Sequence, residues 1–358
     1  MRSHMPAHHI LSYARDLSGG GVERALLRLA AEWADTRRVT LLLGRAAGPL
    51  AAELSPAIAV VELGAPSTAR LARALPGAVR RLRPDILFCP GNNYTSAAAW
   101  AKLRLGPAAP PIVAKQSSAI RRGDHGALVD WGHRVWLRRH GRFLDHLVAM
   151  SPASAAAAAP ATGMAGRVSV ISNPPPPTAS AAPPPPLPDR FILGVGRLAR
   201  QKRWDRLIAA LPALPDAALV LAGDGSQRAA LEAQARALGV AGRVRFIGHV
   251  ADPLPLMARA ATVALTSDYE GVPGVLAEAL SVGAPVVATD SSPAVAEIVT
   301  SPALGDIVAR DDAAALVAAL RHRLAPGAPR PAPQPRPGRD SAARYLQLFD
   351  RLVDARQV

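Results

Sequence analysis

The sequence predicts an α/β protein of two doubly wound domains, each with a parallel sheet covered by helices on both faces. The first observation is that short apolar runs, typical of buried strands, alternate with helical segments along both halves of the 358 residues. The second is the stretch at residues 173–189, NPPPPTASAAPPPPLPD, whose two proline runs favour extended polyproline geometry. An SH3-type ligand is the alternative for such a stretch, but its place between two folded patterns favours a linker.

The strands expected in the first half are six apolar runs separated by helical stretches: residues 39–44, 58–63, 85–90, 111–116, 146–151 and 168–172. The second half alternates more regularly. Its expected strands are residues 191–196, 217–223, 244–248, 263–266, 285–289 and 305–308, and its expected helices are residues 203–214, 226–239, 253–260, 275–283 and 294–299. Alternation of this kind indicates parallel sheets, in which ligands bind at the carboxyl ends of the strands.

These elements define an N-terminal domain at residues 5–172, the linker at 173–189 and a C-terminal domain at 190–324. Residues 1–4, MRSH, resemble an expression scar and are left out of the fold. A second proline-rich stretch follows the C-terminal domain and leads into SAARYLQLFDRLV, which has apolar residues at helical spacing. This last helix must pack against another part of the protein to bury that face.

The net charge of +15 is unevenly distributed. Residues 1–173 hold 22 Lys and Arg against 10 Asp and Glu, a balance of +12, whereas residues 174–358 hold 20 against 17, a balance of +3. This asymmetry indicates an anionic partner for the first half, either nucleic acid or an anionic membrane surface. Solvated charges that reflect compositional bias are the alternative explanation.

Cysteine usage and hydropathy indicate the compartment. The single Cys89 excludes an intrachain disulfide and a Cys-rich metal site, so a reducing cytoplasm is expected. No run reaches the roughly 18 uncharged apolar residues of a membrane-spanning helix, and the N-terminus lacks a signal-peptide pattern. We therefore expect a soluble, cytoplasmic protein.

Polar residues follow each of the first four strands of the C-terminal domain. Arg197 and Lys202 follow the first strand, Asp224 and Gly225 the second, and His249 the third. Arg and Lys are the side chains that bind phosphate, the former bidentately and the latter as a point charge. Taken singly, Lys202 is equally a solvated charge at a helix start and Asp224 an ordinary turn residue. Their ordered recurrence at successive strand ends predicts one binding site.

The fourth strand is followed by SDYEGVPGVLAEAL, which places Glu270 and Glu278 eight positions apart. Pro273 and Gly274 disfavour helix between them, so Glu270 is expected in a loop and Glu278 in a helix that begins after it. Glycines allow close backbone approach, and a helix N-terminus binds anions. The two carboxylates suit hydroxyl groups, such as those of ribose and a sugar. A diphosphate between two hydroxyl-rich groups corresponds to a nucleotide sugar.

The C-terminal domain closely resembles the retaining glycosyltransferases of family four, which have the GT-B fold of two facing Rossmann-like domains. The resemblance runs from Phe191 to Val299 through the stretches ILGVGRLARQKRWDRLIAAL, LVLAGDGSQRAALEAQARALGVAGRVRFIGHV and SDYEGVPGVLAEALSVGAPVVATD. In the first half GGGVERALLRLA, VAMSPAS and VSVISNP are similar to the family's patterns. The resemblance implies that residues 325–358 cross back and pack on the N-terminal domain.

The resemblance also implies roles. Arg197 and Lys202 would bind the donor diphosphate and stabilise the leaving nucleotide, and Glu270 would hold hydroxyls of the donor sugar. Glu278 would bind the ribose. No metal and no further cofactor are implied, because the cationic side chains and helix dipoles supply the positive charge. The remaining residues implied in donor binding are Gly20, Gly21, Gly196, Asp224, Gly225, Gly248, His249, Val250, Gly271, Val272, Pro273, Gly274, Val275 and Leu276; the backbone N–H groups of 272–276 would cap the phosphates.

One departure from the family concerns the acceptor side. Many members place a His after a first-domain strand, but the corresponding segment here reads VAKQSSAIRRGDH. Lys115 or Gln116 takes that place, with His125 further along as a further candidate. The family's mechanism is attack on the face that the nucleotide leaves, with a donor phosphate oxygen taking the acceptor's proton.

The stretch DWGHRVWLRRHGRFLDHL, residues 130–147, is both basic and aromatic. A basic amphipathic segment with Trp on its apolar side indicates binding to a membrane surface, and a core-packed helix with a solvated basic face is the alternative. No nucleic-acid-binding module is recognised. We therefore expect a peripheral enzyme of the inner membrane that glycosylates a lipid-linked or envelope glycan. The residues expected at the membrane are Arg134, Trp136, Arg138, Arg139 and Arg142.

Three other functions fit the same pattern. Within enzymes they are a nucleotide-sugar epimerase and a glycogen-synthase-like polymerase, and outside them a non-catalytic GT-B subunit that binds a nucleotide and supports a partner. The presence of Arg197, Lys202, Glu270 and Glu278 together favours an active transferase.

Overall fold

The protein folds into two compact units, residues 1–174 with 338–358 (unit 1) and residues 175–337 (unit 2). The structure is a computed structural model. It describes residues 6–18, 20–64, 67–117, 127–175 and 186–356.

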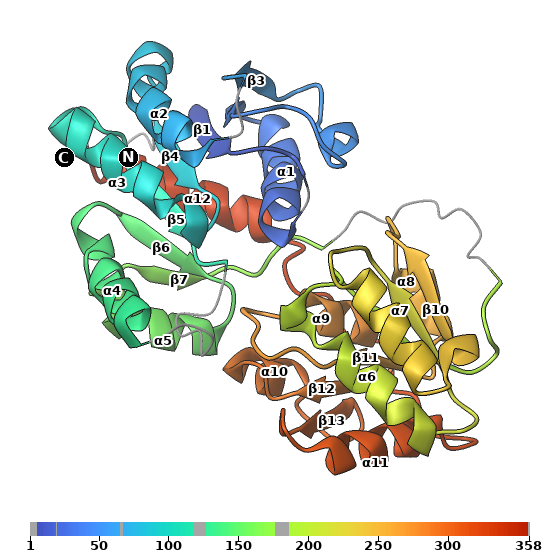
Figure 1. Cartoon of the computed structure of the whole chain (residues 1–358). Coiled ribbons are helices and arrows are strands. Elements are labelled where there is room, and N and C mark those ends of the chain that lie inside the picture. The colour runs from blue at the N-terminus through green and yellow to red at the C-terminus, as the bar shows by residue number, and fades with distance from the viewer. Residues whose placement is uncertain (1–5, 19, 65–66, 118–126, 176–185, 357–358) are drawn as a thin grey trace. The chain divides into compact units, whose positions relative to one another are not determined.

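Unit 1 contains a seven-stranded parallel sheet in the order β3-β2-β1-β4-β5-β6-β7 (Figure 1). The strands are β1 (His9–Ala14), β2 (Arg38–Leu43), β3 (Ala59–Glu62), β4 (Ile86–Cys89), β5 (Ile112–Lys115), β6 (His146–Ala149) and β7 (Val168–Val170). The helices are α1 (Gly21–Ala34), α2 (Thr68–Leu82), α3 (Thr95–Leu105), α4 (Ala127–Arg138), α5 (Pro152–Thr162) and α12 (Ser341–Asp354). The central strands β1, β4 and β5 are buried along their whole length, as expected for the middle of a parallel sheet that is covered on both faces.

Unit 2 contains a six-stranded parallel sheet in the order β10-β9-β8-β11-β12-β13. The strands are β8 (Phe191–Val195), β9 (Ala218–Ala222), β10 (Val244–Gly248), β11 (Thr262–Leu265), β12 (Val286–Thr289) and β13 (Gly305–Val308). The helices are α6 (Trp204–Ala210), α7 (Arg228–Ala237), α8 (Leu254–Arg259), α9 (Gly274–Ser281), α10 (Pro293–Ile298) and α11 (Ala313–Leu324). Separate apolar clusters fill the two faces of this sheet.

In both sheets the strand order reverses direction beside the first strand, which is the arrangement of doubly wound Rossmann-like folds. The reversal lies between β1 and β4 in unit 1 and between β8 and β11 in unit 2. Loops that leave neighbouring strands there diverge to opposite faces, and this opens a crevice at the carboxyl edge. The predicted fold class is confirmed.

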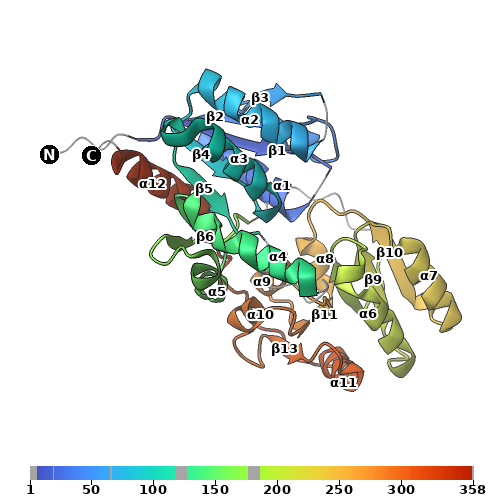
Figure 2. The same cartoon turned by 60° about the vertical axis from the view of Figure 1, so that its left-hand side comes forward.

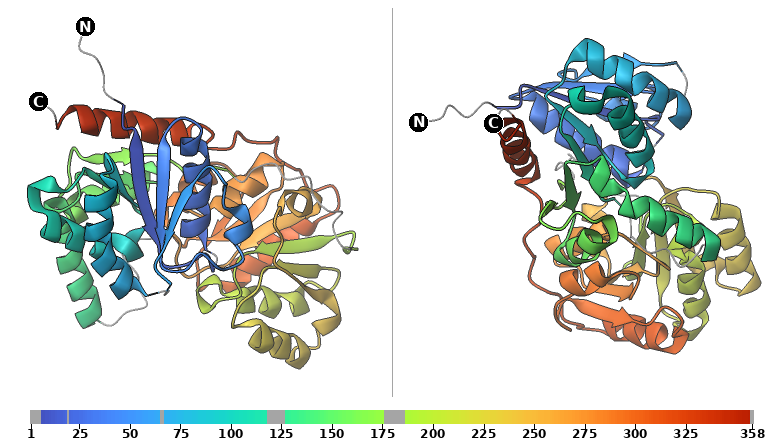
Figure 3. Two further views of the ribbon diagram at one scale, coloured as in Figure 1. Left: turned by 90° about the horizontal axis from the view of Figure 1, so that it is seen from above. Right: turned by 90° about the vertical axis from the view of Figure 1, so that its left-hand side faces the viewer.

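The C-terminal helix α12 belongs to unit 1, where it packs beside α1 (Figures 2 and 3). Its Tyr345 and Phe349 enclose Trp33 of α1, with ring centroids 5.6 and 5.3 Å from the indole. Trp33 also donates its Nε1–H to the carbonyl of Ala342 at 3.2 Å. The apolar face predicted for this helix is therefore part of the core of unit 1.

The proline-rich stretch before α12 differs from the prediction that all of residues 325–358 pack on the first domain. Residues 325–337 belong to unit 2. The N–H of Gln334 donates to the carbonyl of Leu280, and the Arg330 guanidinium donates to the carbonyls of Ala258 and Ala260. Proline-rich chain forms no ladder of its own, so its remaining polar groups bind the loops and helix ends of the unit that it follows. Among the described residues no helix is long and apolar enough to cross a membrane.

Candidate active site

The carboxyl edge of the unit 2 sheet brings Lys202 and Glu270 into contact. Lys202 ends a 3₁₀ turn after β8, and Glu270 lies in the loop after β11, the neighbouring strand across the reversal of strand order. The Lys202 Nζ lies 2.6 Å from Glu270 Oε1, and the two side chains are 16% and 11% exposed. The same oxygen accepts from Ser267 Oγ at 2.6 Å. The site therefore holds a largely desolvated ion pair, which proteins keep only where the geometry supports both charges.

The backbone of residues 266–270 is held from both neighbouring strand ends. Gln201 accepts from the N–H of Asp268 at 2.9 Å and donates its side-chain amide to the carbonyl of Tyr269 at 2.7 Å. Thr289, at the end of β12, donates to the carbonyl of Ser267 at 2.7 Å. The N–H of Glu270 donates to the carbonyl of Ser291 at 3.0 Å. These bonds fix the backbone that carries the Glu270 side chain.

Helix α9 begins at Gly274, so Glu270 lies in the preceding loop and Glu278 in the second turn of the helix, as predicted. The predicted row of phosphate-binding N–H groups from 272 to 276 is shorter than expected. Proline has no N–H, and the N–H of Leu276, which is fully buried, donates to the carbonyl of Pro273 at 3.1 Å. At the start of α9 the N–H groups of Gly274 and Val275 therefore remain as donors. Glu278 is half-buried.

Arg197 follows β8 with an exposed side chain, and among the described residues its guanidinium has no hydrogen bond or ion pair. Its backbone is fixed, since Trp204 donates its Nε1–H to the Arg197 carbonyl at 3.0 Å. The loop after β9 lies directly against this segment. A Cβ on Gly223, whose φ is +151°, would lie 2.0 Å from the carbonyl oxygen of Gly196, and a Cβ on Gly225 would lie 2.4 Å from that of Leu198. Only glycine fits at these two positions.

Asp224, predicted to bind the donor, binds other loops in this structure. Its Oδ2 accepts from the N–H of His249 at 3.0 Å, and its Oδ1 accepts from Arg228 at 3.3 Å. Gly248 has a φ of +73°, which a left-handed turn of the chain requires, and Val250 beyond it is half-buried. Asp224 thus connects the strand ends of β9 and β10.

The carboxyl edge of the unit 1 sheet carries Gly20 and Gly21 at the start of α1, after β1. Glu23 in the first turn accepts from the hydroxyl of Tyr94 at 2.9 Å. Gln116 is buried, and its N–H donates to the carbonyl of Val148. His125, the third candidate for the acceptor side, lies outside the described residues.

Lys115, one of the two residues expected in the place of the family's His, is not at the surface. Its side chain is 2% exposed, and its Nζ donates to Asn173 Oδ1 at 3.0 Å. Burial lowers the pKa of the Lys115 ammonium to about 8, against a smaller opposing effect of Glu23. Lys115 therefore binds the asparagine at the end of the first domain, and its ammonium is not exposed at the surface of unit 1.

The basic stretch predicted at the membrane is helix α4 with the turn after it. Arg134, Arg138, Arg139 and Arg142 are exposed. Trp136 is not on that surface, since it packs against His140 and Phe143 and donates to Thr95 Oγ1 at 3.3 Å. The exposed aromatic residue is Trp131, at 59%.

Trp100 and Leu103 on α3 are also exposed apolar residues, at 39% and 73%, and were not predicted from the sequence. Arg104 lies over the Trp100 ring at 5.6 Å, and α3 packs beside α2 (Figure 2). The sequences of α2 and α3 contain six Lys and Arg and no Asp or Glu, and this charge pattern could have predicted a basic surface here.

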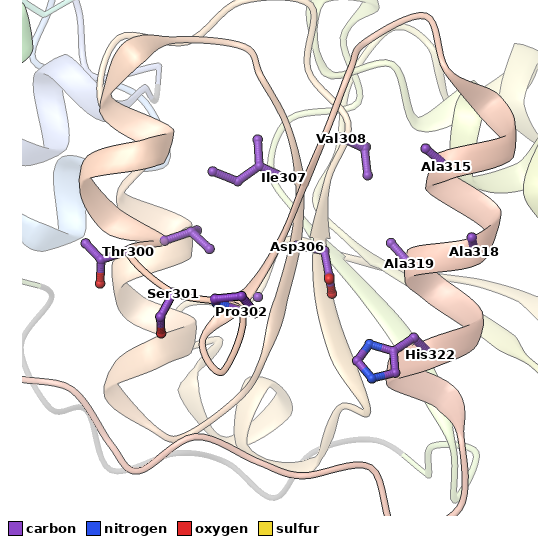
Figure 4. A pocket seen from close by; sticks show the side chains of 12 residues that line it. Thr300, Ser301, Pro302, Asp306, Ile307, Val308, Ala315, Ala318, Ala319 and His322 are labelled. Carbon is purple, nitrogen blue, oxygen red and sulfur yellow. The ribbon is translucent and has the colours of Figure 1, made fainter.

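A pocket of about 600 Å³ lies elsewhere in unit 2, between the edge strand β13 and helix α11 (Figure 4). Ile307 and Val308 line one side, and Ala315, Ala319 and His322 line the other. None of the predicted site residues contributes to it. Among the residues that the structure describes, no group of three or more His, Cys, Asp and Glu side chains is placed to hold a metal ion.

Two Rossmann-like units in one chain, with a partly buried Lys–Glu pair at the carboxyl edge of the second sheet, are the arrangement of glycosyltransferases of the GT-B fold. Comparison with known protein families gives the same class. Residues 177–328 match the family "Glycosyl transferases group 1", and residues 20–174 match "Glycosyl transferase 4-like domain". The protein therefore belongs to the group 1 glycosyltransferases.

Curated relatives match in part of their length. A lipopolysaccharide core biosynthesis glycosyltransferase, LpsE, of Rhizobium meliloti is 38% identical over 100 residues, 28% of this chain and 29% of that protein. An N-acetylgalactosamine-N,N'-diacetylbacillosaminyl-diphospho-undecaprenol 4-alpha-N-acetylgalactosaminyltransferase of Campylobacter jejuni is 32% identical over 139 residues, 38% of each protein. The chain thus spans less than two fifths of the length of either relative.

Among solved structures, Anabaena Alr3699/HepE in complex with UDP and glucose has the same fold. Its TM-score is 0.66 at 22% identity, over 98% of this chain and 97% of that one. At this identity the likeness establishes the fold.

Proposed function

We propose that this protein is a retaining, metal-independent glycosyltransferase that moves a hexose from a nucleoside-diphosphate sugar to a hydroxyl of an envelope or lipid-linked glycan. The observation that carries the proposal is the buried pair of Lys202 and Glu270 at the carboxyl edge of unit 2. A cation and a hydroxyl acceptor held side by side suit the junction between a diphosphate and a sugar.

The cationic groups bind the donor diphosphate. The guanidinium of Arg197, which is exposed, binds the diphosphate at the solvent side. Lys202 binds it inside the site, because its ammonium has three donors and Glu270 uses only one of them. The N–H groups of Gly274 and Val275 at the start of α9 add a third point of contact, favoured by the helix dipole. These groups stabilise the charge that develops on the leaving diphosphate.

The carboxylates bind hydroxyl groups. Glu270 accepts from the donor sugar through the oxygen that neither Lys202 nor Ser267 occupies. Glu278, half-buried on the helix that follows, accepts from the ribose. In the reaction the bond from the anomeric carbon to the diphosphate oxygen breaks, and the acceptor oxygen bonds to the same face of that carbon. Because the acceptor bonds to the face that the nucleotide leaves, the anomeric configuration is retained, and the acceptor's proton passes to a phosphate oxygen of the leaving nucleotide.

Three relatives support the choice of substrates. HepE binds UDP and glucose, LpsE acts in lipopolysaccharide core biosynthesis, and the Campylobacter enzyme is named for a diphospho-undecaprenol substrate and an alpha linkage. We therefore propose a UDP-hexose first among donors, with GDP-sugars as the alternative, and an acceptor from envelope polysaccharide biosynthesis.

The test is release of nucleoside diphosphate from a panel of UDP- and GDP-sugars, with chelator present and with undecaprenyl-diphosphate glycans or lipopolysaccharide core as acceptors. Transfer in chelator, with the donor's anomeric configuration kept in the product by NMR, is the expected result. An inverted product excludes retention, and loss of activity in chelator excludes metal independence. Interconversion of the sugar without an acceptor identifies an epimerase, and nucleotide binding without turnover identifies the non-catalytic subunit.

We further propose that an anionic membrane is the partner of the outer surface formed by α2, α3 and α4. Arg70, Arg73, Arg80 and Arg81 of α2 are exposed there beside Trp100 and Leu103 of α3, with Val129 and Trp131 exposed on α4. Arginine attracts anionic headgroups at about 1 kcal/mol per charge, and exposed Trp and Leu insert at the headgroup level. Nucleic acid would use the charge but leaves the apolar residues without a role.

Co-sedimentation with phosphatidylglycerol vesicles tests this surface. Arg73→Glu changes the charge by two and is expected to weaken binding about thirtyfold, and Leu103→Ser, which removes an inserting apolar side chain, about tenfold. The control changes on unit 2, Arg236→Glu and Leu238→Ser, alter exposed residues of the same types, with Leu238 41% exposed against 73% for Leu103, and are expected to leave binding unchanged. Equal binding to neutral vesicles, or DNA binding that exceeds vesicle binding at the same salt concentration, contradicts the proposal.

A further inference from the structure

The two carboxylate oxygens of Glu270 have different surroundings. Oε1 accepts from both Lys202 Nζ and Ser267 Oγ, each at 2.6 Å. Neither of these donors binds Oε2. Glu270 is 9% exposed, so its carboxylate cannot exchange these partners freely for water.

Ser267 is itself inaccessible to a ligand. The residue is 0% exposed, and its carbonyl accepts from Thr289 Oγ1 at 2.7 Å. The next residue, Asp268, donates its N–H to the carbonyl of Gln201 at 2.9 Å. The backbone on both sides of the Ser267 hydroxyl is therefore fixed, and the hydroxyl can affect a bound substrate only through Glu270.

Once a donor is bound, Lys202 contacts two anions, the Glu270 carboxylate and the diphosphate, whereas Ser267 contacts only the carboxylate. The diphosphate attracts the Lys202 ammonium and shifts it. If Lys202 were its only partner, the Glu270 carboxylate would rotate with the ammonium. The Ser267 hydroxyl is neutral and buried, so its bond to Oε1 does not depend on the diphosphate. It is the contact that keeps the carboxylate in place when Lys202 also binds the diphosphate.

We propose that Ser267 is a positioning residue that fixes Glu270 by Oε1 and so presents Oε2 to a hydroxyl of the donor sugar. This inference rests on the proposed function, because it assumes that Glu270 binds the sugar of a nucleotide donor. It adds that removal of one hydroxyl, that of Ser267, separates recognition of the sugar from recognition of the nucleotide. Loss of Ser267 weakens the first and spares the second.

Isothermal titration of the full chain with UDP and with UDP-glucose tests the separation. Ser267→Ala is expected to lower the affinity for UDP-glucose about tenfold, the usual range for a hydrogen bond to a charged group, and to change the affinity for UDP less than twofold. Thr262→Val is the matched control, since Thr262 is also 0% exposed in unit 2 and donates to the carbonyl of Pro285. It is expected to change neither affinity.

A double-mutant cycle with Glu270→Gln shows whether Ser267 acts through Glu270. If it does, Ser267→Ala changes the affinity for UDP-glucose less than twofold in the Glu270→Gln background. Additive losses, or equal losses for UDP and UDP-glucose, overturn the positioning role and leave the proposed function standing. Wild-type protein that binds UDP-glucose no differently from UDP, together with an unaffected Glu270→Gln variant, contradicts the sugar-binding role of Glu270 and this inference with it.

Discussion

Replacement of Lys115 by Met is predicted to stabilise unit 1 and to flatten its pH dependence. Burial lowers the pKa of Lys115 from 10.5 to about 8. Below pH 8 both the folded and the unfolded chain carry the charge, and the folded state bears the cost of burying it. Between pH 8 and 10.5 the unfolded chain binds more protons, so the free energy of unfolding rises with pH across this window. At 1.36 kcal/mol for each pH unit the rise is about 3 kcal/mol.

Lys115→Met removes this cost and also the hydrogen bond to Asn173, which contributes about 1 kcal/mol. The variant is therefore expected to be more stable by about 2 kcal/mol at pH 7 and to lose the rise between pH 8 and 10.5. Urea unfolding followed by Trp fluorescence measures this in a Trp204→Phe background, since Trp204 is the one Trp in residues 175–337. Parallel pH profiles for the two proteins would refute the reasoning, because they would mean that Lys115 titrates alike in the folded and unfolded chain.

Two further predictions concern the core and the loops. Gly223→Ala is expected to lower the thermal midpoint of unit 2 sharply and to abolish nucleotide binding, because its Cβ would lie 2.0 Å from the Gly196 carbonyl. Gly242→Ala, with no atom within 4 Å, is the matched control, and equal midpoints for the two variants would contradict the account. Tyr345→Ala is expected to cost unit 1 about 3–5 kcal/mol by opening a cavity against Trp33. Urea unfolding checks it, and a loss below 1 kcal/mol would mean that α12 contributes little to that core.

The fold could be predicted from the sequence because strand burial leaves a direct trace. FILGV and ALVLA are continuous apolar runs between turns, and each forms a buried strand. The helix start at Gly274 followed from Pro273 and Gly274, which exclude helix from the residues before them. In each case a local steric rule decided the outcome.

The contacts within the site were less predictable. Arg197, Lys202 and Glu270 were recognised singly, but the pairing of Lys202 with Glu270 spans 68 positions and depends on the order of β8 and β11. The bonds of Asp224 to His249 and Arg228 likewise depend on tertiary loop packing.

Burial of single polar and aromatic residues was the other limit. Lys115 was a candidate because it stands where the resembling family has a His, and nothing local in the sequence indicated that its ammonium is buried and binds Asn173. Trp136 looked like a membrane anchor, yet it packs against Phe143. Periodicity places a residue on a helix face or a strand end, but which neighbours cover it is decided by elements far away in the chain. The SxxE spacing of Ser267 and Glu270 was the one local sign of their contact.

The central claim is that the edge carrying Lys202 and Glu270 performs glycosyl transfer. The most direct measurement is release of nucleoside diphosphate from the donor that the panel identifies. Wild type, Glu270→Ala and Glu232→Ala are compared at a temperature well below the thermal midpoint of each. Glu232 is an acidic residue of the outer helix α7 that pairs with Arg228. We predict a loss of at least about a hundredfold for Glu270→Ala, because a donor sugar that loses its hydroxyl acceptor is misplaced for the reaction, and wild-type turnover for Glu232→Ala. Equal turnover by wild type and Glu270→Ala would contradict the account.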